Sequence, residues 1–503
     1  MSAQLSAALA EWSSLLGTRW VIAGGSPLEE AERTTFATRQ RIPAILRPAN
    51  AEEVAGCLRI AQRHRVPIHP VSRGRNWGYG SRVPAGDCVL MQLERLDRIV
   101  AYDDRLGTLT VEPGVTFEQA HRHLQELRAR FFLTTIGGPP DASLLANALE
   151  RGDGRGPNAD IFAHVCALEV ILPSGERVET GLGRFGNARA QHGYRWGLGP
   201  SLDGLFSQSN LGVVTRITLW LTPRPASYRE VSWALEEDAQ LPPLIDSLQS
   251  LIAEGTVRAS AFVWNELKAL SVTRQYPFAQ TRGRVPLPPP LLEAWREGFG
   301  RWAGSTGLYA ASPALGTALE ARVREVLGPV VSRLKVTELP PDAQSPMLGT
   351  PSGANLAMAY WRKRTPVPAS PDLDRDRCGF LWSSVAVPFT GEEAATAQEI
   401  SQRVCRMFGL EPNLALLAPV SRCLSLVSAL VFDREVAGED DKALACLKAL
   451  ERELGAAGYL PARLGIASFP ENHPTVDDSR EVLRRLKQAV DPANVLSPGR
   501  YGL

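Results

Sequence analysis

The chain has 503 residues, of which 44% are hydrophobic and 22% are charged, and its formal net charge is +1. Such a composition is typical of a globular protein that is large enough for two or more domains. A nearly neutral charge argues against nucleic acid or a membrane surface as the main partner.

Cysteine usage and targeting signals indicate the compartment. The seven cysteines are scattered and no pair has C-x-x-C spacing, so neither a zinc site nor a disulfide framework is indicated. We therefore expect no metal, and mostly buried thiols in a reducing compartment. Residues 1–16 lack the basic and apolar regions of a signal peptide, and no run approaches the roughly 18 apolar residues of a membrane span. A cytoplasmic location is predicted.

The N-terminal part predicts a strand–helix–strand unit. Residues 42–46 and 66–70 are short apolar segments typical of strands. Between them, Asn50 is suited to cap a helix, Glu53 stands at the capping-box position, and apolar residues then recur at helical spacing. Residues 88–91 are a further strand candidate.

A glycine-rich loop, residues 70–80, follows the second strand. Three glycines lie within seven residues of this loop. Such a backbone turns tightly and points several N–H groups into one concavity, which is a nest for phosphate oxygens, and Arg73 and Arg75 add positive charge. Neither the G-x-G-x-x-G fingerprint nor a P-loop is present. Taken alone, the loop is equally consistent with a glycine-rich surface turn.

The next stretch continues as an α+β domain. Residues 109–115 predict a strand, and Thr116 with Gln119 forms a second capping-box pair at the start of a helix. A passage of polar and small residues at 137–157 leads to predicted strands at 164–172 and 212–221.

After residue 225 the character of the sequence changes. Residues 226–455 combine helical patterns, the last at 442–454, with apolar runs typical of strands, which predicts a second α+β domain. Residues 480–489 predict a basic amphipathic helix, and residues 491–502 a loop-like tail.

Several of these segments, taken together, resemble one family, the vanillyl-alcohol oxidase / para-cresol methylhydroxylase family of FAD-dependent oxidoreductases. The resemblance is carried, in chain order, by residues 72–80, 111–116, 143–154, 199–215, 491–494 and 498–500. It implies an α+β, two-domain fold, with a PCMH-type FAD-binding domain at 1–225, a cap or substrate domain at 226–455, and a C-terminal return to the FAD domain at 456–503.

The resemblance also implies FAD as cofactor, with hydride passing from a substrate carbon to the flavin. Partners would be a small-molecule substrate and molecular oxygen or another electron acceptor, and a homodimer is possible. The residues that match the family's FAD-binding segments are Ser72, Arg73, Gly74, Arg75, Asn76, Gly78, Tyr79, Glu112, Pro113, Gly114, Ser143, Asn147, Glu150, Arg151, Gly152, Gly212, Val213, Val214 and Arg500.

Members of the family often tether FAD through a His or Tyr of the cap domain. Alignment places Leu426 at that position. Leucine cannot form the bond, so non-covalent FAD is predicted. Cys423 is a nucleophile nearby, although a buried structural cysteine is the favoured interpretation.

Phenol-oxidising members hold the phenolate between two tyrosines and an arginine. Tyr79 matches the first tyrosine and Arg463 the arginine, but Ala462 stands where the second tyrosine is expected. An acidic residue expected beside the flavin is replaced by Gly138, and Asp141, close in sequence, is the candidate substitute.

A further active-site tyrosine of the family is replaced by Asn158, with Arg155 nearby. Thus the set of residues that binds a phenolate is incomplete, while the arginines are retained. The planar guanidinium of arginine suits a carboxylate. We therefore predict hydride removal from a hydroxyl-bearing carbon of a carboxylic acid in secondary metabolism. A β-keto acid then loses carbon dioxide, which makes the reaction an oxidative decarboxylation.

The predicted catalytic residues are Tyr79, Arg463, Arg155 and Asp141. Two other functions stay open. One is a para-alkylphenol or vanillyl-alcohol-type oxidase or dehydrogenase that uses Tyr79 and Arg463 alone. The other is a catalytically silent flavin-fold subunit, in which Arg463 and Arg155 serve as structural ion-pair residues and Tyr79 as a packing aromatic.

Overall fold

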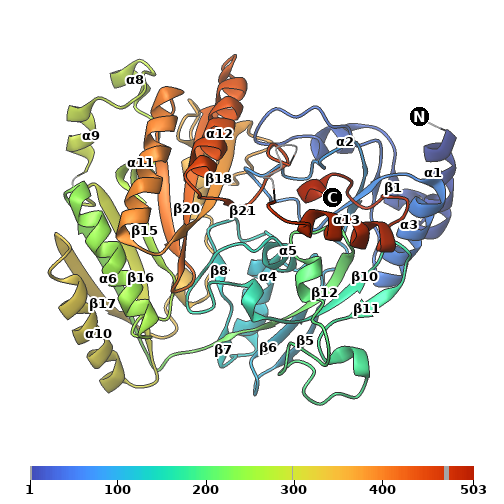
Figure 1. Ribbon diagram of the computed structural model, residues 1–503, viewed down its shortest axis with the longest axis horizontal. Coiled ribbons are helices and arrows are strands. Elements are labelled where there is room, and N and C mark those ends of the chain that lie inside the picture. Colours follow the sequence, from blue (N-terminus) through green and yellow to red (C-terminus); the bar gives the residue numbers. More distant parts are fainter. Residues whose placement is uncertain (1–2, 297, 470–474) are drawn as a thin grey trace.

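A computed structural model describes residues 3–296, 298–469 and 475–503. The chain forms two parts that lie side by side (Figure 1). We call them the N-terminal module, which contains residues 3–223 and the C-terminal segment 475–503, and the cap, residues 227–463. In the described part of the chain, no helix has the length and apolar character required to cross a membrane.

The first sheet of the N-terminal module has the order β1-β2-β4-β3, and β2, β4 and β3 are parallel. Helix α3 connects β2 to β3, as the sequence predicts, and the Asn50 Oδ1 atom accepts a hydrogen bond of 2.8 Å from the Glu53 N–H. The elements are α1 (Ala3–Leu16), β1 (Val21–Ile22), α2 (Ser26–Ala31), β2 (Ile45–Leu46), α3 (Ala51–His64), β3 (Ile68–Val71) and β4 (Val89–Gln92).

The second sheet of this module is antiparallel, in the order β11-β10-β12-β6-β5. The predicted capping box is present at the start of α4, where Thr116 and Gln119 exchange side-chain-to-backbone hydrogen bonds. The elements are β5 (Ile99–Asp103), β6 (Thr108–Val111), α4 (Phe117–Glu126), β7 (Phe131–Phe132), β8 (Thr135–Ile136), α5 (Leu144–Leu149), β9 (Gly154–Arg155), β10 (Val165–Ile171), β11 (Arg177–Glu179), β12 (Val213–Trp220) and β13 (Thr222–Pro223).

The cap is built on an eight-stranded sheet in the order β17-β14-β16-β15-β19-β20-β18-β21, with helices α6, α10, α11 and α12 over one face (Figure 1). The elements are β14 (Ser227–Leu235), α6 (Leu241–Ala253), β15 (Ala261–Asn265), α7 (Glu266–Thr273), α8 (Phe278–Thr281), α9 (Pro289–Trp295), β16 (Trp302–Ala310), α10 (Pro313–Leu327), β17 (Arg333–Leu339), β18 (Cys378–Pro388), α11 (Gly391–Met407), β19 (Asn413–Ala418), β20 (Cys423–Asp433), α12 (Glu439–Ala456) and β21 (Pro461–Arg463).

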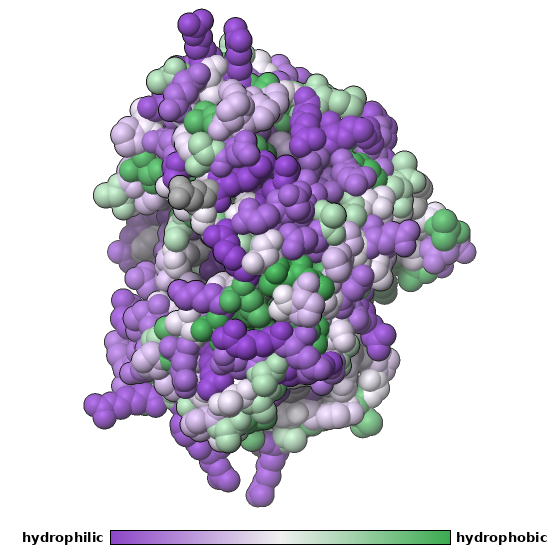
Figure 2. All heavy atoms as spheres, turned by 90° about the vertical axis from the view of Figure 1, so that its left-hand side faces the viewer, coloured by the Kyte–Doolittle hydropathy of each residue, from purple (hydrophilic) through white to green (hydrophobic). Residues whose placement is uncertain are grey.

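The strand alternation of the cap sheet separates its two faces. Side chains such as Leu416 and Leu426 point into the hydrophobic core beneath the helices, while their neighbours Leu417, Ser425 and Val427 point toward the N-terminal module. The outer surface of the cap is mostly hydrophilic (Figure 2), because the helices turn their apolar sides to the sheet. The open face of the sheet is therefore available to form a site.

The C-terminal segment returns to the N-terminal module through α13 (Ser479–Val490). The buried Lys487 ammonium on this helix donates to the Asn210 and Leu496 carbonyls and to the Asp491 carboxylate. The Ile68 N–H then donates to the Val495 carbonyl at 2.8 Å, which fixes the tail against β3. The predicted boundary at 455/456 falls before β21, which still pairs with β18 of the cap sheet.

Candidate active site

A large cavity of about 400 Å³ lies where the two parts meet. The N-terminal module contributes the glycine-rich loop, the segment 136–155 and residues 206–214. The cap contributes the open faces of β15, β18, β19 and β20, and the C-terminal segment closes one end with residues 496–500. The site is thus assembled from stretches that are far apart in sequence.

The glycine-rich loop lies against the cavity in the geometry of an anion nest. Gly74 and Gly78 have φ angles of 67° and 81°, which side chains other than glycine rarely adopt. A Cβ atom on Gly78 would lie 2.5 Å from Trp382 of the cap, so glycine also permits the close approach of the two parts. The backbone N–H groups of residues 73–77 donate to no acceptor in the described part of the chain.

The donors and acceptors around the cavity fit a flavin dinucleotide. The loop offers N–H groups to phosphate oxygens, and Arg73, which lines the cavity, has no ion-pair partner among the described residues. The side-chain oxygens of Asn147 and Asn210 are buried without a hydrogen-bond donor, and both residues line the cavity. Buried acceptors of this kind require a partner. A bound FAD would supply ring N–H and ribityl O–H groups.

Most of the residues that match the family's FAD segments lie on the cavity wall. The exceptions are Gly78, Glu112, Pro113 and Gly114. The Glu112 carboxylate is ion-paired with Arg98 at 2.7 Å, and Gly114 packs on the Glu94 carbonyl, so this turn supports the domain beneath the site. The predicted residues on the wall are Ser72, Arg73, Gly74, Arg75, Asn76, Tyr79, Ser143, Asn147, Glu150, Arg151, Gly152, Gly212, Val213, Val214 and Arg500.

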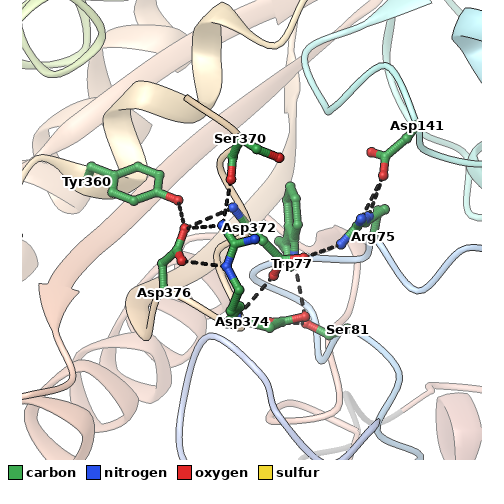
Figure 3. Close-up of polar contacts among 10 residues, drawn as sticks. Arg75, Trp77, Ser81, Asp141, Tyr360, Ser370, Asp372, Asp374 and Asp376 are labelled. Carbon is green, nitrogen blue, oxygen red and sulfur yellow. Dashed lines mark hydrogen bonds and ion pairs between the residues drawn. The ribbon is translucent and has the colours of Figure 1, made fainter. Parts of the chain in front are cut away.

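Arg75 is held between two carboxylates, as Figure 3 shows. Its guanidinium lies 2.7 Å from Asp141 and 2.6 Å from Asp372 of the cap. Its positive charge is therefore compensated within the protein, in contrast to that of Arg73. Asp141, predicted as a base, is engaged in this pair and does not line the cavity.

The same network ties the glycine-rich loop to the cap through Asp374 (Figure 3). The buried Asp374 carboxyl accepts hydrogen bonds from Trp77 Nε1 at 3.0 Å and from Ser81 Oγ at 2.8 Å. Burial, with a smaller contribution from the neighbouring Asp372, raises the pKa of Asp374 to about 7.

Tyr79 and Arg463, both predicted as catalytic, are in contact at the cavity wall. The Arg463 guanidinium lies 4.3 Å from the centroid of the Tyr79 ring, and it donates a hydrogen bond of 2.6 Å to Asn76 Oδ1. Its Nε atom is 3.8 Å from the Glu150 carboxylate. Burial raises the pKa of Tyr79 to about 12, although Arg463 opposes the shift. The Tyr79 hydroxyl is therefore protonated at neutral pH and acts as a donor.

Asp153 is a cavity residue that the sequence did not single out. Burial raises the pKa of its carboxyl to about 6, while a hydrogen bond from Ser425 and the charge of Arg463 oppose the shift. A carboxyl with such a pKa exchanges protons readily near neutral pH. Its only sequence signal is its place inside the loop 143–154.

Arg155 and Lys268 bring two basic side chains to the cavity. Arg155 is on β9, with its guanidinium 5.6 Å from the Phe262 ring of the cap, and Lys268 is on α7, 5.3 Å from the Trp382 ring. Burial, followed by the charge of Arg155, lowers the pKa of Lys268 to about 7. The sequence signal missed for Lys268 is a lysine among apolar residues of a short helix.

Leu426 does not face the cavity. Its side chain lies in the core under the cap helices, and the cavity-facing residues of β20 are Ser425 and Val427. Leu426 therefore has no side-chain access to the cavity, because strand neighbours point to opposite faces. Of the described cavity residues, His69 and Tyr79 alone are His, Tyr or Cys, and both belong to the N-terminal module.

This sequence departs from the family's pattern at three further positions, and two of them lie on the cavity wall. Gly138 and Ala462 line the cavity. Asn158 does not, because its amide donates a hydrogen bond to the Trp220 carbonyl at 3.1 Å. Cys423 is half-buried and off the cavity wall, and the other six cysteines are buried as expected.

Comparisons with known proteins agree with this geometry. A family model described as an FAD binding domain matches residues 42–181. The chain is 41% identical to 1'-carboxy-chondrochloren decarboxylase of Chondromyces crocatus, over 99% of this chain and 97% of that protein. It is 26% identical to the flavoprotein subunit of 4-cresol dehydrogenase [hydroxylating] of Pseudomonas putida, over 92% and 88% of the two chains.

Solved structures show the same fold. The crystal structure of p-cresol methylhydroxylase with substrate bound superposes with a TM-score of 0.90 at 24% identity, covering 100% of this chain and 98% of that one. The 4-ethylphenol oxidase of Gulosibacter chungangensis gives a TM-score of 0.91 at 23% identity with the same coverage. The predicted α+β fold with a PCMH-type FAD-binding domain and a cap is confirmed.

Proposed function

The chain belongs to the vanillyl-alcohol oxidase / para-cresol methylhydroxylase family of FAD-dependent oxidoreductases, and from this premise we propose that it oxidises and decarboxylates a β-hydroxy acid. A bound FAD would supply the hydride acceptor for the hydroxyl-bearing carbon. The substrate thereby becomes a β-keto acid. This acid releases carbon dioxide without further oxidation, because the ketone accepts the electrons of the breaking bond, and the methylene carbon takes up a proton.

The observation that carries the proposal is the half-buried cation Arg155. Its guanidinium lines the same cavity as Tyr79 and Asp153, and no carboxylate of the described residues pairs with it. A charge that is withdrawn from water without a partner is costly, so a ligand of opposite charge is expected there. Among small molecules, a carboxylate meets this requirement and matches the planar guanidinium.

The residues near Tyr79 suit the handling of the substrate hydroxyl. Tyr79 is protonated and donates a hydrogen bond to the hydroxyl oxygen, which orients the carbon that loses hydride. Asp153 accepts the hydroxyl proton, since its pKa of about 6 leaves it mostly ionised at neutral pH. Arg463 stabilises charge beside both groups, because its field acts on each of them.

The similarity to the chondrochloren decarboxylase supports this reaction class, because that protein's name specifies a carboxy compound that loses carbon dioxide. We further propose that FAD is held without a covalent bond, since β20 offers Ser425 and Val427 to the cavity. Reoxidation would use oxygen or another acceptor.

The test is anaerobic mixing of the FAD-loaded protein with β-hydroxy-β-phenylpropanoate. We expect bleaching of the flavin, with acetophenone and carbon dioxide formed in equal amounts. Bleaching by para-cresol, and none by the hydroxy acid, contradicts the proposal.

Bleaching by para-cresol alone would favour a second function, the oxidation of para-alkylphenols. One observation supports this function. Tyr79 and Arg463 keep the contact expected of half a phenolate clamp, with 4.3 Å between guanidinium and ring centroid. Against this function, Ala462 stands at the position of the second tyrosine, so the second hydroxyl that would hold a phenolate is missing.

A further inference from the structure

We propose that Lys268 and Arg155 together form the subsite that binds the substrate carboxylate, and that Arg463 does not take part in it. The inference rests on the proposed function and names the part of the cavity that recognises the acid. It adds Lys268, a cap residue, to a site whose other predicted charges come from the N-terminal module and β21.

Lys268 differs from the other buried lysines of the described chain. Lys363 is paired with Asp433 at 3.2 Å, and Lys487 is paired with Asp491 at 2.6 Å. Lys268 is 5% exposed, yet its ammonium contacts only the Met358 sulfur and the face of Trp382, and no described acid pairs with it. Such a charge lacks the compensation that a buried ammonium requires.

Arg155 makes it energetically more costly for Lys268 to be protonated. Both residues line the cavity, and among the described residues Arg155 is the charged group that lowers the pKa of Lys268. Protonated Lys268 and Arg155 therefore repel each other. A ligand carboxylate placed between them removes the repulsion and accepts hydrogen bonds from both.

Arg463 already has partners within the protein. One terminal nitrogen of its guanidinium donates to Asn76, the group stacks on Tyr79, and Nε, which makes no hydrogen bond, lies 3.8 Å from Glu150. It also belongs to the group of charges around the C-terminal return, where Arg500 and Glu150 form a close pair. A substrate carboxylate at Arg463 would compete with Glu150, whereas at Lys268 it has no competitor.

The placement of the two ends of the site suits a hydroxy acid. Strand β18 presents Trp382 and Ser384 to the cavity, with Lys268 over the Trp382 ring and Tyr79 close enough to Ser384 for that residue to lower its pKa. The group that would bind the carboxylate and the group that would bind the hydroxyl therefore lie beside neighbouring cavity-facing positions of one strand. The aromatic surfaces of Phe262 and Trp264 leave room for an apolar group.

The experiment compares an acid with its neutral amide, using ligands that the enzyme cannot oxidise. The FAD-loaded protein is titrated with phenylpropanoate and with phenylpropanamide, and the perturbation of the flavin spectrum gives each Kd. We expect the acid to bind at least about tenfold more tightly than the amide. Lys268→Met and Arg155→Met should each weaken the acid about 10- to 100-fold and change the amide less than about threefold.

Two further variants keep the result interpretable. Lys268→Arg retains the charge and should preserve the preference for the acid, which a merely structural role would not predict. Arg274→Met removes an exposed cation at the end of the same helix and should change neither Kd. Equal affinities for acid and amide in the parent protein, or equal weakening of both ligands in Lys268→Met, would overturn the inference.

The two proposals fail in different ways. If the parent protein releases carbon dioxide from the hydroxy acid but Lys268→Met and Arg155→Met still bind phenylpropanoate normally, the subsite is wrong and the reaction stands. If the acid preference depends on both cations but no hydroxy acid is oxidised, the subsite stands and the proposed reaction is wrong.

Discussion

At the scale of single residues, the cavity separates groups by their electrostatic surroundings. Burial holds Tyr79 protonated, the pKa of Asp153 is about 6 and that of Lys268 about 7, and Arg155 has no described carboxylate as a partner. Asp141, in contrast, is neutralised by Arg75. The chemistry of each side chain therefore follows from what lies beside it, and residue type alone does not decide it.

The first prediction concerns the Tyr79 hydroxyl. Tyr79→Phe keeps the ring under Arg463 but removes the donor that orients the substrate hydroxyl. We expect the rate of flavin reduction to fall about 100-fold, with a much smaller change in substrate Kd, because the lost hydrogen bond acts on developing charge. Anaerobic stopped-flow absorbance measures both quantities.

A matched control is Tyr459→Phe. Its hydroxyl bonds to Glu393 outside the cavity, so the same chemical change should leave the reduction rate unaltered. An unchanged rate in Tyr79→Phe would contradict the assigned role.

At the scale of elements, the glycine-rich loop is fixed by the cap. Thr35 is fully buried and joins the two, since its hydroxyl donates to the Phe380 carbonyl of β18 and accepts from the Gly78 N–H. Asp374 holds the loop from the other side through Trp77 and Ser81. The phosphate nest is therefore preorganised by contacts outside its own sequence.

The second prediction is a pH dependence of stability through Asp374. Its pKa is about 7 in the folded protein and near 4 in an unfolded chain. Between these values the unfolded chain binds fewer protons, so this residue makes the free energy of unfolding decrease as pH rises from about 4 to 7. The decrease amounts to a few kcal/mol, at about 1.4 kcal/mol for each pH unit.

Asp374→Asn keeps an acceptor for Trp77 and cannot ionise. The free energy of unfolding of the variant should therefore fall less between pH 4 and 7 than that of the parent. The variant should become steadily more stable relative to the parent over this range. Denaturant unfolding at several pH values measures it. If the free energy of unfolding changed with pH in the same way for parent and variant, the assigned pKa would be contradicted.

At the scale of the whole molecule, the cofactor site joins the two parts. Its walls come from the N-terminal module, the cap and the C-terminal segment, so a bound FAD would contact all three. The C-terminal return is held by the buried Lys487–Asp491 pair against β3. Cofactor binding and the association of the two parts are thus coupled.

The third prediction follows from this coupling and from the absence of a tethering side chain on β20. Acid precipitation should release yellow FAD into the supernatant. The FAD-depleted protein should show a Tm that rises with added FAD, by the equivalent of about 2.7 kcal/mol at 100 times the Kd. Pigment that stays in the pellet would show a covalent bond, and His69 and Tyr79 would be the residues to examine by peptide mapping.

The sequence by itself determined the local structure and the cofactor class. The capped helices α3 and α4, the strands around them and the glycine-rich loop depend on short-range signals, namely side-chain caps, hydrophobic periodicity and glycine at positive φ. The family resemblance supplied the fold and FAD, and most of the matching residues line the cavity.

Only the tertiary structure decided which charges are compensated. Arg75, Arg155 and Arg463 look alike in the sequence, but Arg75 is neutralised by two carboxylates from distant segments, Arg463 is engaged by Asn76 and Glu150, and Arg155 is left unpaired. Lys268 gives only one short-range sign, a lysine among apolar residues of a short helix, and this does not specify a role. The physical reason is that burial and ion pairing depend on residues brought together by folding across hundreds of positions, whereas caps and turns depend on neighbours a few residues away.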